Sequence, residues 1–261
     1  MEYRLEKCPI CGSLLLKEVS SRKDNDDIYY SYHCEACDSL VEGKPLPKLE
    51  LEKPVIKSNS LSPEEVFAKC IDGIFEIIVY KDTSIACVGT AFAIDKYHIA
   101  TNKHIINYVK KPEGSTITYY IQKYKKKFEI IPLKLIGCSE KYDFGILKVD
   151  QPHTTLKPLK ITTRQLKVGE PAYCIGNAKG DGIRMTSGIV SDIGRFDRGR
   201  EILLTSAQSE KGNSGSPIID KHGEVIAINY AIRAESSSMH YSIPSNVIVR
   251  EINNILGNIK E

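Results

Sequence analysis

Short apolar or alternating runs of residues follow one another through most of the chain, with turn signals between them. Such runs are typical of β-strands, because successive side chains of a strand point to opposite faces. No long helical pattern separates them, which favours antiparallel β-structure over a parallel α/β sheet. We therefore expect an all-β fold of two six-stranded antiparallel barrels, at about residues 74–150 and 160–243. The expected strands are residues 74–80, 87–94, 117–122, 128–136, 144–149, 172–175, 185–193, 201–205, 217–220, 225–232 and 239–243.

Helix signals stand at both ends of this β-rich region. Ser62, Pro63 and Glu65 form a capping-box pattern, which predicts a short helix that stops at Gly73. At the other end, Ser245 can cap a helix over residues 245–259 with one apolar stripe. We expect that stripe to pack on the second barrel.

Composition excludes several classes of protein. The chain has 261 residues, of which 41% are hydrophobic and 26% charged, so it can bury a core and is not disordered. No apolar run approaches the roughly 18 residues that a membrane-spanning helix needs. The net charge of +3 is too even for a protein built around nucleic-acid phosphates. The first residues show no secretory signal, so we expect a cytoplasmic protein without a membrane partner.

Four of the eight cysteines form two pairs near the N-terminus, Cys8 with Cys11 and Cys34 with Cys37. Two thiolates two residues apart can grip one ion, and a second pair completes a tetrahedral shell. We expect a closed, structural zinc site. Iron is an alternative, since a Cys-Pro-x-Cys-Gly turn resembles both zinc ribbons and rubredoxin-type iron sites, and disulfides are the other reading. Residues 1–41 are thus expected to be a zinc-ribbon-like module.

Between the module and the β-rich region lies a stretch rich in charged residues and proline. Residues 42–61 show little periodicity, which predicts an extended linker. The remaining residues, 62–261, are expected to form the second domain.

Three clusters of residues carry chemistry. They are residues 101–104 (TNKH), residues 143–147 (DFGIL) and residues 212–217 (GNSGSP). Nucleophilic acyl transfer needs a nucleophile, a base within reach and a group that fixes the base's tautomer, and Ser, His and Asp can fill these roles. A tight glycine turn around Ser214 can aim the amides of Gly212 and Ser214 at an oxyanion.

These blocks resemble the trypsin-like serine peptidases of the chymotrypsin fold, in particular the HtrA/DegP type. Further similar blocks are residues 89–94, 175–177, 186–191, 223–229 and 241–245, so the resemblance extends from about residue 66 to residue 249. It implies that His104 is the general base, Asp143 its orienting acid and Ser214 the nucleophile.

The resemblance implies a serine endopeptidase that hydrolyses polypeptides through an acyl-enzyme. The alternative is a catalytically silent, peptide-binding adaptor whose zinc ribbon recruits a partner. This chain is also expected to be able to form a homo-oligomer or to bind a protein partner through the ribbon. Nucleic acid is not an expected partner.

Substrate preference follows from the same resemblance. Gln208 is expected at the base of the primary pocket, with Ile228, Asn229 and Tyr230 along one wall. No acid stands at the base, so we expect a small or medium apolar residue before the cleaved bond rather than Lys or Arg. Residues 212–217 also resemble glutamyl endopeptidases, but those enzymes carry histidine where Asn229 stands, so the sequence does not support a preference for glutamate.

Overall fold

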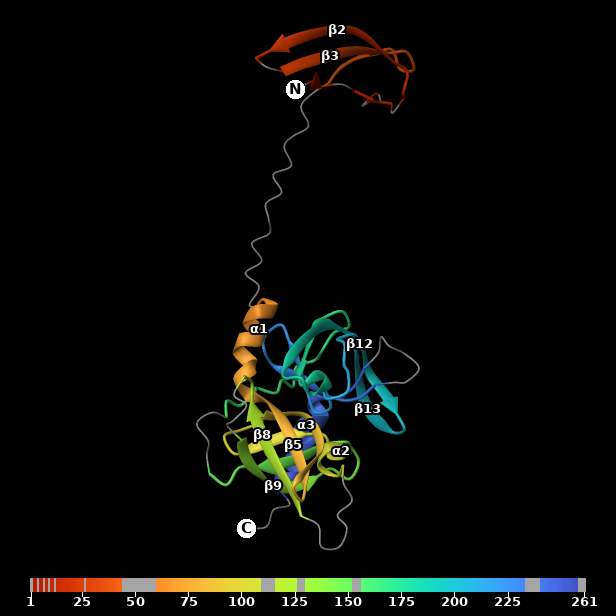
Figure 1. Cartoon of the computed structure of the whole chain (residues 1–261). Helices are drawn as coiled ribbons and strands as arrows, with labels where there is room; N and C mark the ends of the chain where they lie inside the picture. The colour runs from red at the N-terminus through yellow and green to blue at the C-terminus, as the bar shows by residue number, and fades with distance from the viewer. Residues whose placement is uncertain are drawn as a thin grey trace. The chain divides into compact units, whose positions relative to one another are not determined.

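The computed structural model describes the following residues: 2–3, 5–6, 8, 10–11, 13–25, 27–43, 60–108, 116–125, 130–151, 156–232 and 240–257. The chain divides into two compact units, residues 1–57 and 58–261 (Figure 1). Most of the expected linker, residues 44–59, lies outside the described residues, as do the expected strand residues 128–129 and 239 and the expected helix residues 258–259.

The first unit is built on a small four-stranded sheet. Its strands are β1 (Glu2–Tyr3), β2 (Leu16–Asp24), β3 (Asp27–Cys34) and β4 (Ser39–Glu42). β2 and β4 pair with β3 in antiparallel fashion, and β1 pairs with it in parallel. Among the described residues of this unit, the buried core consists of Cys8, Tyr30, Tyr32, Cys34 and Val41. A core this small provides little hydrophobic stabilisation, so the unit depends on another source of folding energy.

The first six strands of the second unit close into a barrel, in the order β10-β7-β6-β5-β8-β9. Their bounds are β5 (Ile74–Lys81), β6 (Ser84–Ala93), β7 (His98–Thr101), β8 (Ile117–Lys123), β9 (Ile130–Cys138) and β10 (Gly145–Lys148). All of these strands except β7 lie where the sequence pattern predicts them. β7 (HIAT) has only two consecutive apolar residues, Ile99 and Ala100, and this run is too short to be recognised as a strand.

The last six strands form a second closed barrel, in the order β11-β12-β13-β16-β15-β14. Their bounds are β11 (Pro171–Gly176), β12 (Arg184–Asp197), β13 (Arg200–Thr205), β14 (Pro217–Asp220), β15 (Val225–Ile232) and β16 (His240–Pro244). Figure 1 shows β12 and β13 in teal and cyan, apart from the yellow and green strands of the first barrel.

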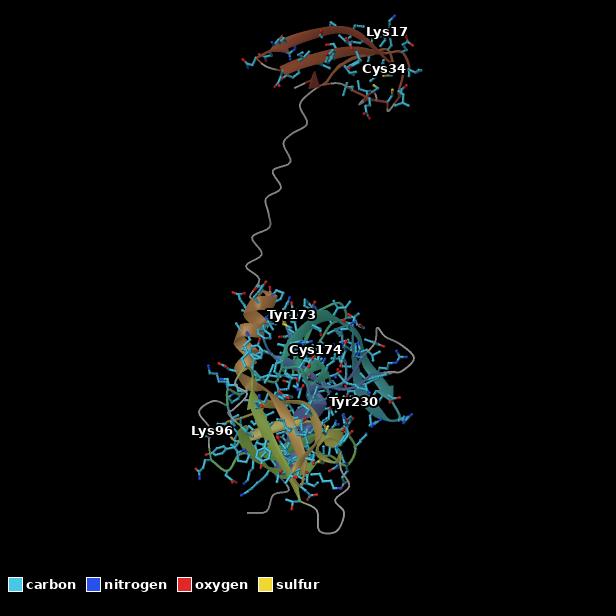
Figure 2. All side chains as sticks on the ribbon, in the orientation of Figure 1. Lys17, Cys34, Lys96, Tyr173, Cys174 and Tyr230 are labelled. Atoms are coloured by element: carbon cyan, nitrogen blue, oxygen red, sulfur yellow. The ribbon has the colours of Figure 1, made fainter. Side chains whose placement is uncertain are left out.

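Alternation along the strands separates the barrel interior from a second apolar layer. Tyr173 and Cys174, both labelled in Figure 2, are successive residues of β11. Cys174 packs inside the second barrel with Val190 and Leu203. Tyr173 instead joins an apolar cluster that includes Phe92 and other residues of the first barrel. The two barrels therefore share one continuous core, which fixes the residues at their junction relative to one another.

The helices contribute to this shared core. α1 (Pro63–Cys70) begins with the predicted capping box, in which the Glu65 amide donates to Ser62 Oγ at 3.3 Å, and a 3₁₀ turn, η1 (Ile71–Gly73), ends it. α3 (Ser245–Gly257) contacts β9 of the first barrel as well as β15 and β16 of the second. The prediction that α3 packs on the second barrel is therefore incomplete, because its apolar stripe is wide enough to cover both. Among the described helices, none has the length and apolarity needed to cross a membrane.

Candidate active site

The imidazole of His104 and the carboxylate of Asp143 are directly paired. His104 Nδ1 lies 2.6 Å from Asp143 Oδ2, and the backbone amide of His104 donates to Asp143 Oδ1 at 2.8 Å. Both carboxylate oxygens are therefore engaged by one residue. Because an ionised carboxylate only accepts hydrogen bonds, Nδ1 must carry the proton, and Nε2 is left as the basic nitrogen. The His104 side chain is 44% exposed, so that nitrogen can be reached from solvent.

Local structure holds this pair in place. His104 lies in α2 (Lys103–Ile106), a single turn that begins where β7 ends. Asn102, completely buried, donates from Nδ2 to the carbonyl of Asp143 at 2.9 Å, and Lys103 Nζ reaches the carbonyl of Ser139 at 2.7 Å. These two hydrogen bonds tie the start of α2 to the loop that carries Asp143. Asn102 was not singled out by the sequence analysis, although it belongs to the TNKH block.

Two glycines shape the loop around Ser214. Gly212 and Gly215 have φ angles of +95° and +83°, values that favour glycine. Space matters too. A Cβ on Gly212 would lie 2.1 Å from the carbonyl oxygen of Asn177, and one on Gly215 would lie 2.1 Å from that of Thr90. Any side chain at either position would therefore push the loop away from the rest of the site.

The amides of Gly212 and Ser214 are available to a ligand. Within the described residues, neither amide donates a hydrogen bond, whereas those of Asn213 and Gly215 bond to Glu210 and Asn229. The carbonyl of Lys211 accepts from the Lys179 amide at 2.6 Å. Since the C=O and N–H of a trans peptide point in opposite directions, this bond turns the Gly212 N–H away from residue 179.

Thr90 of the first barrel fixes this loop, which belongs to the second. Its amide donates to the carbonyl of Ser214 at 2.9 Å, and its hydroxyl donates to the carbonyl of Gly212 at 2.8 Å. The same hydroxyl accepts from the Asn177 amide at 2.9 Å. Thr90 is a positioning residue that the sequence analysis did not assign, although its block, residues 89–94, was noted for its resemblance to the peptidases.

The structure brings Ser214 next to the turn that carries His104 without bonding the two side chains. A Cβ on Gly89 would lie 2.9 Å from Ile105 Cδ1 and 3.3 Å from the carbonyl oxygen of Ser214. Ile105 follows His104 directly in α2. Among hydrogen bonds between described residues, none joins Ser214 Oγ to His104. Catalytic hydrogen bonds are often long in ligand-free sites and shorten once substrate is bound.

The expected pocket residues do not share one surface. Asn229 of β15 is 2% exposed and donates from Nδ2 to Ser209 Oγ at 2.8 Å and to the carbonyl of Asn213 at 3.0 Å. Its neighbours Ile228 and Tyr230 lie on the other face of β15 and pack into the core shared by the barrels. Burial there raises the pKa of Tyr230 (Figure 2). Gln208 is exposed and accepts a hydrogen bond at its carbonyl from Thr186.

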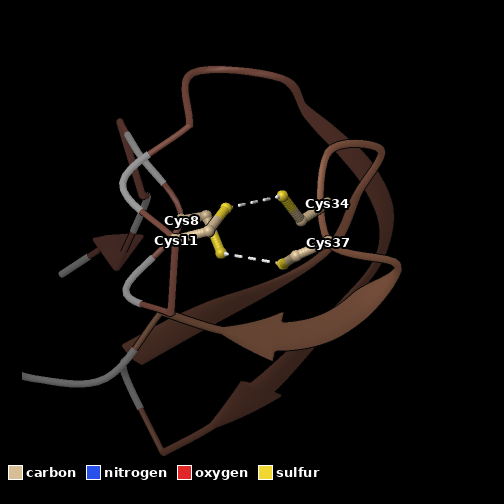
Figure 3. A group of neighbouring side chains, drawn as sticks. All are labelled: Cys8, Cys11, Cys34 and Cys37. Carbon is tan, nitrogen blue, oxygen red and sulfur yellow. Dashed lines mark hydrogen bonds between the residues drawn. The ribbon is translucent and has the colours of Figure 1, made fainter.

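The four paired cysteines of the first unit converge (Figure 3). All four sulfurs lie within 4.8 Å of one another, with 3.8 Å between Cys8 and Cys37 and 3.6 Å between Cys11 and Cys34. A tetrahedral ion with metal–sulfur bonds of about 2.3 Å holds its sulfurs about 3.8 Å apart, so the spacing fits one ion. The hydroxyl of Ser39 and the other three thiols lower the pKa of Cys37 to about 6. All eight cysteines are free, which disagrees with the disulfide alternative.

The chain belongs to the family defined by the trypsin-like peptidase domain. The model of this family matches residues 89–228, which are more than half of the chain. Its relatives are serine endoproteases of the Do/Deg type. The chain is 32% identical over 166 residues to the periplasmic pH-dependent serine endoprotease DegQ of Escherichia coli, a match that covers 61% of this chain and 34% of DegQ. It is 27% identical to the chloroplastic Protease Do-like 5 of Arabidopsis thaliana, covering 95% of this chain and 83% of that protein.

Solved structures show the same fold. A serine endoprotease from Yersinia pestis superposes with a TM-score of 0.66 at 23% identity, covering 76% of this chain and 67% of that one. The HtrA-type protease AlgW, solved with a decapeptide, superposes with a TM-score of 0.65 at 19% identity, covering 76% and 68%. The expected chymotrypsin-like β-fold with a C-terminal helix is thereby confirmed. The relatives named above are serine endoproteases, the class of enzyme that the sequence predicts. The chain spans about a third of the length of DegQ.

The expectation of a cytoplasmic protein is contradicted by these relatives. DegQ and DegP of Escherichia coli are periplasmic, and Do-like 1 and 5 of Arabidopsis thaliana are chloroplastic. That expectation came from the first residues, which show no secretory signal.

Proposed function

We propose that this chain is an HtrA/DegP-type serine endopeptidase that cleaves polypeptides through a Ser214 acyl-enzyme. The observation that carries the proposal is the engagement of both Asp143 oxygens by His104, beside a glycine turn with two free amides. Asp95 contacts the amide and Nδ1 of His98 in the same way, so an acid–histidine pair alone does not mark a catalytic site. What distinguishes His104 is the neighbouring loop of Ser214, in which the amides of Gly212 and Ser214 donate no hydrogen bond within the described residues. The silent-adaptor alternative leaves this arrangement without a purpose.

In the proposed reaction, Ser214 Oγ attacks the carbonyl carbon of the substrate while His104 Nε2 takes the hydroxyl proton. The carbonyl oxygen becomes an oxyanion and accepts hydrogen bonds from the amides of Gly212 and Ser214. His104 then gives its proton to the nitrogen of the leaving amine, and the peptide bond breaks. Water, deprotonated by His104, releases the acyl group from Ser214. Asp143 stays ionised throughout and stabilises the imidazolium.

Cleavage of an unfolded polypeptide tests this function. We expect the full chain to release peptides from a reduced, carboxymethylated protein, and to stop doing so after treatment with a fluorophosphonate. An unfolded substrate is the appropriate probe, because the peptide must adopt an extended form to enter the site. Peptide release that persists in fully labelled enzyme would contradict a serine mechanism.

We further propose that Cys8, Cys11, Cys34 and Cys37 hold one structural zinc ion in a zinc-ribbon-like module of residues 1–41, with iron as the alternative ion. Four thiolate ligands leave no open position, so the ion would organise the fold and would not activate water. The fitting sulfur spacing and the small core of the first unit support this assignment. A homo-oligomer, or a partner bound by the ribbon, stays a prediction.

Metal removal should unfold the first unit alone. In the full chain, a chelator should abolish amide hydrogen-exchange protection in β2 and β3 and leave β5 and β6 protected, because ion binding supplies on the order of 10 kcal/mol of folding energy to such modules. Cys34→Ser should act like the chelator, whereas Cys87→Ser, at a half-buried cysteine in the second unit, should not. Elemental analysis that finds no ion in the untreated protein, together with unchanged exchange, would refute the site.

A further inference from the structure

Four polar side chains inside the second barrel are almost completely buried, and each has an atom without a hydrogen-bond partner. They are Thr205, Asn229, His240 and Ser242, with exposed fractions of 0%, 2%, 2% and 0%. Among the described residues, Thr205 Oγ1, Asn229 Oδ1, Ser242 Oγ and both ring nitrogens of His240 have no partner. Buried polar groups are normally satisfied, so such a group of unpaired atoms indicates a partner from outside the chain.

Strand register places these four side chains on one surface, which we call the polar cluster. Thr205 of β13 is directly opposite His240 of β16, and Ser242 of β16 is directly opposite Asn229 of β15. Cross-strand partners point to the same face of a sheet, as do residues two apart in one strand. Leu203, which lies two residues before Thr205, packs in the interior of the barrel, so this face is the inner one.

The polar cluster adjoins the loop that carries Ser214. Asn229 Nδ2 donates to the carbonyl of Asn213 at 3.0 Å, and the carbonyl of Asn229 accepts from the Gly215 amide at 3.0 Å. Asn229 also donates from its own amide to the carbonyl of Ser216 at 2.9 Å. The residues on either side of the nucleophile are therefore bonded to a member of the cluster, so a substrate side chain at the cleaved bond is close to it.

The hydrogen-bonding groups of the polar cluster determine which substrate side chain it can bind. An apolar side chain would leave the hydroxyls and the imidazole unpaired. A lysine or arginine would find no counter-charge, since within the described residues no Asp or Glu side chain bonds to the cluster. A carboxylate can accept from the hydroxyls of Thr205 and Ser242 and from an N–H of His240. Burial lowers the pKa of His240, and an anion beside it would favour the protonated ring.

We propose that the polar cluster is the primary specificity site and that it selects an acidic side chain, glutamate in particular, immediately before the cleaved bond. The inference rests on the proposed peptidase function. It replaces the apolar preference expected from the sequence, which considered the neighbours of Asn229 but not β16. Glutamyl endopeptidases carry a histidine where Asn229 stands. In this chain, His240 of the adjacent strand β16 provides the imidazole instead.

Matched fluorogenic peptides test the proposal. They differ only in the residue before the cleaved bond, which is Glu, Gln, Leu or Lys, and kcat/KM is measured with the full chain. We expect Glu to exceed each of the others by about 10-fold or more. His240→Ala should lower kcat/KM for Glu by about 10- to 100-fold, the loss of one charged hydrogen bond, and change the Leu value by less than about threefold. His222→Gln, on a turn outside the cluster, is the matched control and should change neither value.

Fluorophosphonate titration separates failure of this inference from failure of the proposed function. A chain that is folded but not labelled at Ser214 would refute the peptidase itself. A labelled chain that prefers Gln or Leu, or whose Glu preference survives His240→Ala, would refute only the acidic site. If His240→Ala does not fold, Thr205→Val keeps the side-chain shape and removes one donor, and it should reduce the ratio of Glu to Leu by about threefold or more.

Discussion

Replacing Ser214 by alanine is expected to reduce peptide hydrolysis by at least about 10⁴-fold, the largest effect of any single change in this chain. The substitution removes only the attacking oxygen. The amides of residues 212 and 214 stay, and so do the bonds from Thr90 to the carbonyls of Gly212 and Ser214. Because the backbone of the loop is untouched, thermal unfolding of Ser214→Ala should match that of the unmodified protein.

Ser216→Ala is the matched control for this experiment. It removes a hydroxyl two residues away in the same loop region, from a side chain that is completely buried. We expect its kcat/KM to stay within about threefold of the unmodified value. Hydrolysis that falls equally in both variants would mean that the loop had been disturbed, and hydrolysis that survives Ser214→Ala would exclude Ser214 as the nucleophile.

The second large effect is expected for Asp143→Asn, with kcat falling by about 10⁴-fold. Asparagine can keep the hydrogen bond from the His104 amide through its oxygen, so the backbone of α2 stays in place. The NH₂ group would then face Nδ1 and donate to it, which moves the imidazole proton to Nε2. His104 could no longer accept a proton from Ser214. The substrate KM should change little, because the altered group does not touch substrate.

Asp192→Asn is the control for charge removal, since Asp192 is an exposed acid paired with Arg195 at 3.2 Å. It should leave kcat within about twofold, because an exposed ion pair contributes little to stability and, among the described residues, the acid bonded to His104 is Asp143. Steady-state rates of the two variants test this prediction. Near-ultraviolet circular dichroism checks that each variant keeps the native fold in solution. A kcat for Asp143→Asn above a tenth of the original would show that Asp143 does not set the tautomer.

Sequence patterns predicted the strands well because alternation is a local property. β5, β8, β13 and β15 lie within a few residues of their expected positions. β7 was not among the expected strands, because its apolar run, Ile99 and Ala100, is too short to be recognised. The packing of α3 against both barrels also depends on distant segments that no local pattern encodes.

Residue types with obvious chemistry were found from sequence, whereas residues that position them were not. His104 and Asp143 were singled out, and the structure pairs them. Thr90 was not assigned, because its hydroxyl bonds to Asn177 and Gly212, both far along the chain from it. The residues of the predicted pocket do not share one surface for a related reason. Ile228 and Asn229 are neighbours in sequence, yet strand alternation sends their side chains to opposite faces.

The most direct test of the account is to locate a fluorophosphonate adduct by mass spectrometry of the digested protein. The account predicts one adduct per chain, on Ser214, which is lost in His104→Ala although that variant keeps the native fold. An adduct on another serine, or equal labelling with and without the imidazole of residue 104, would contradict it.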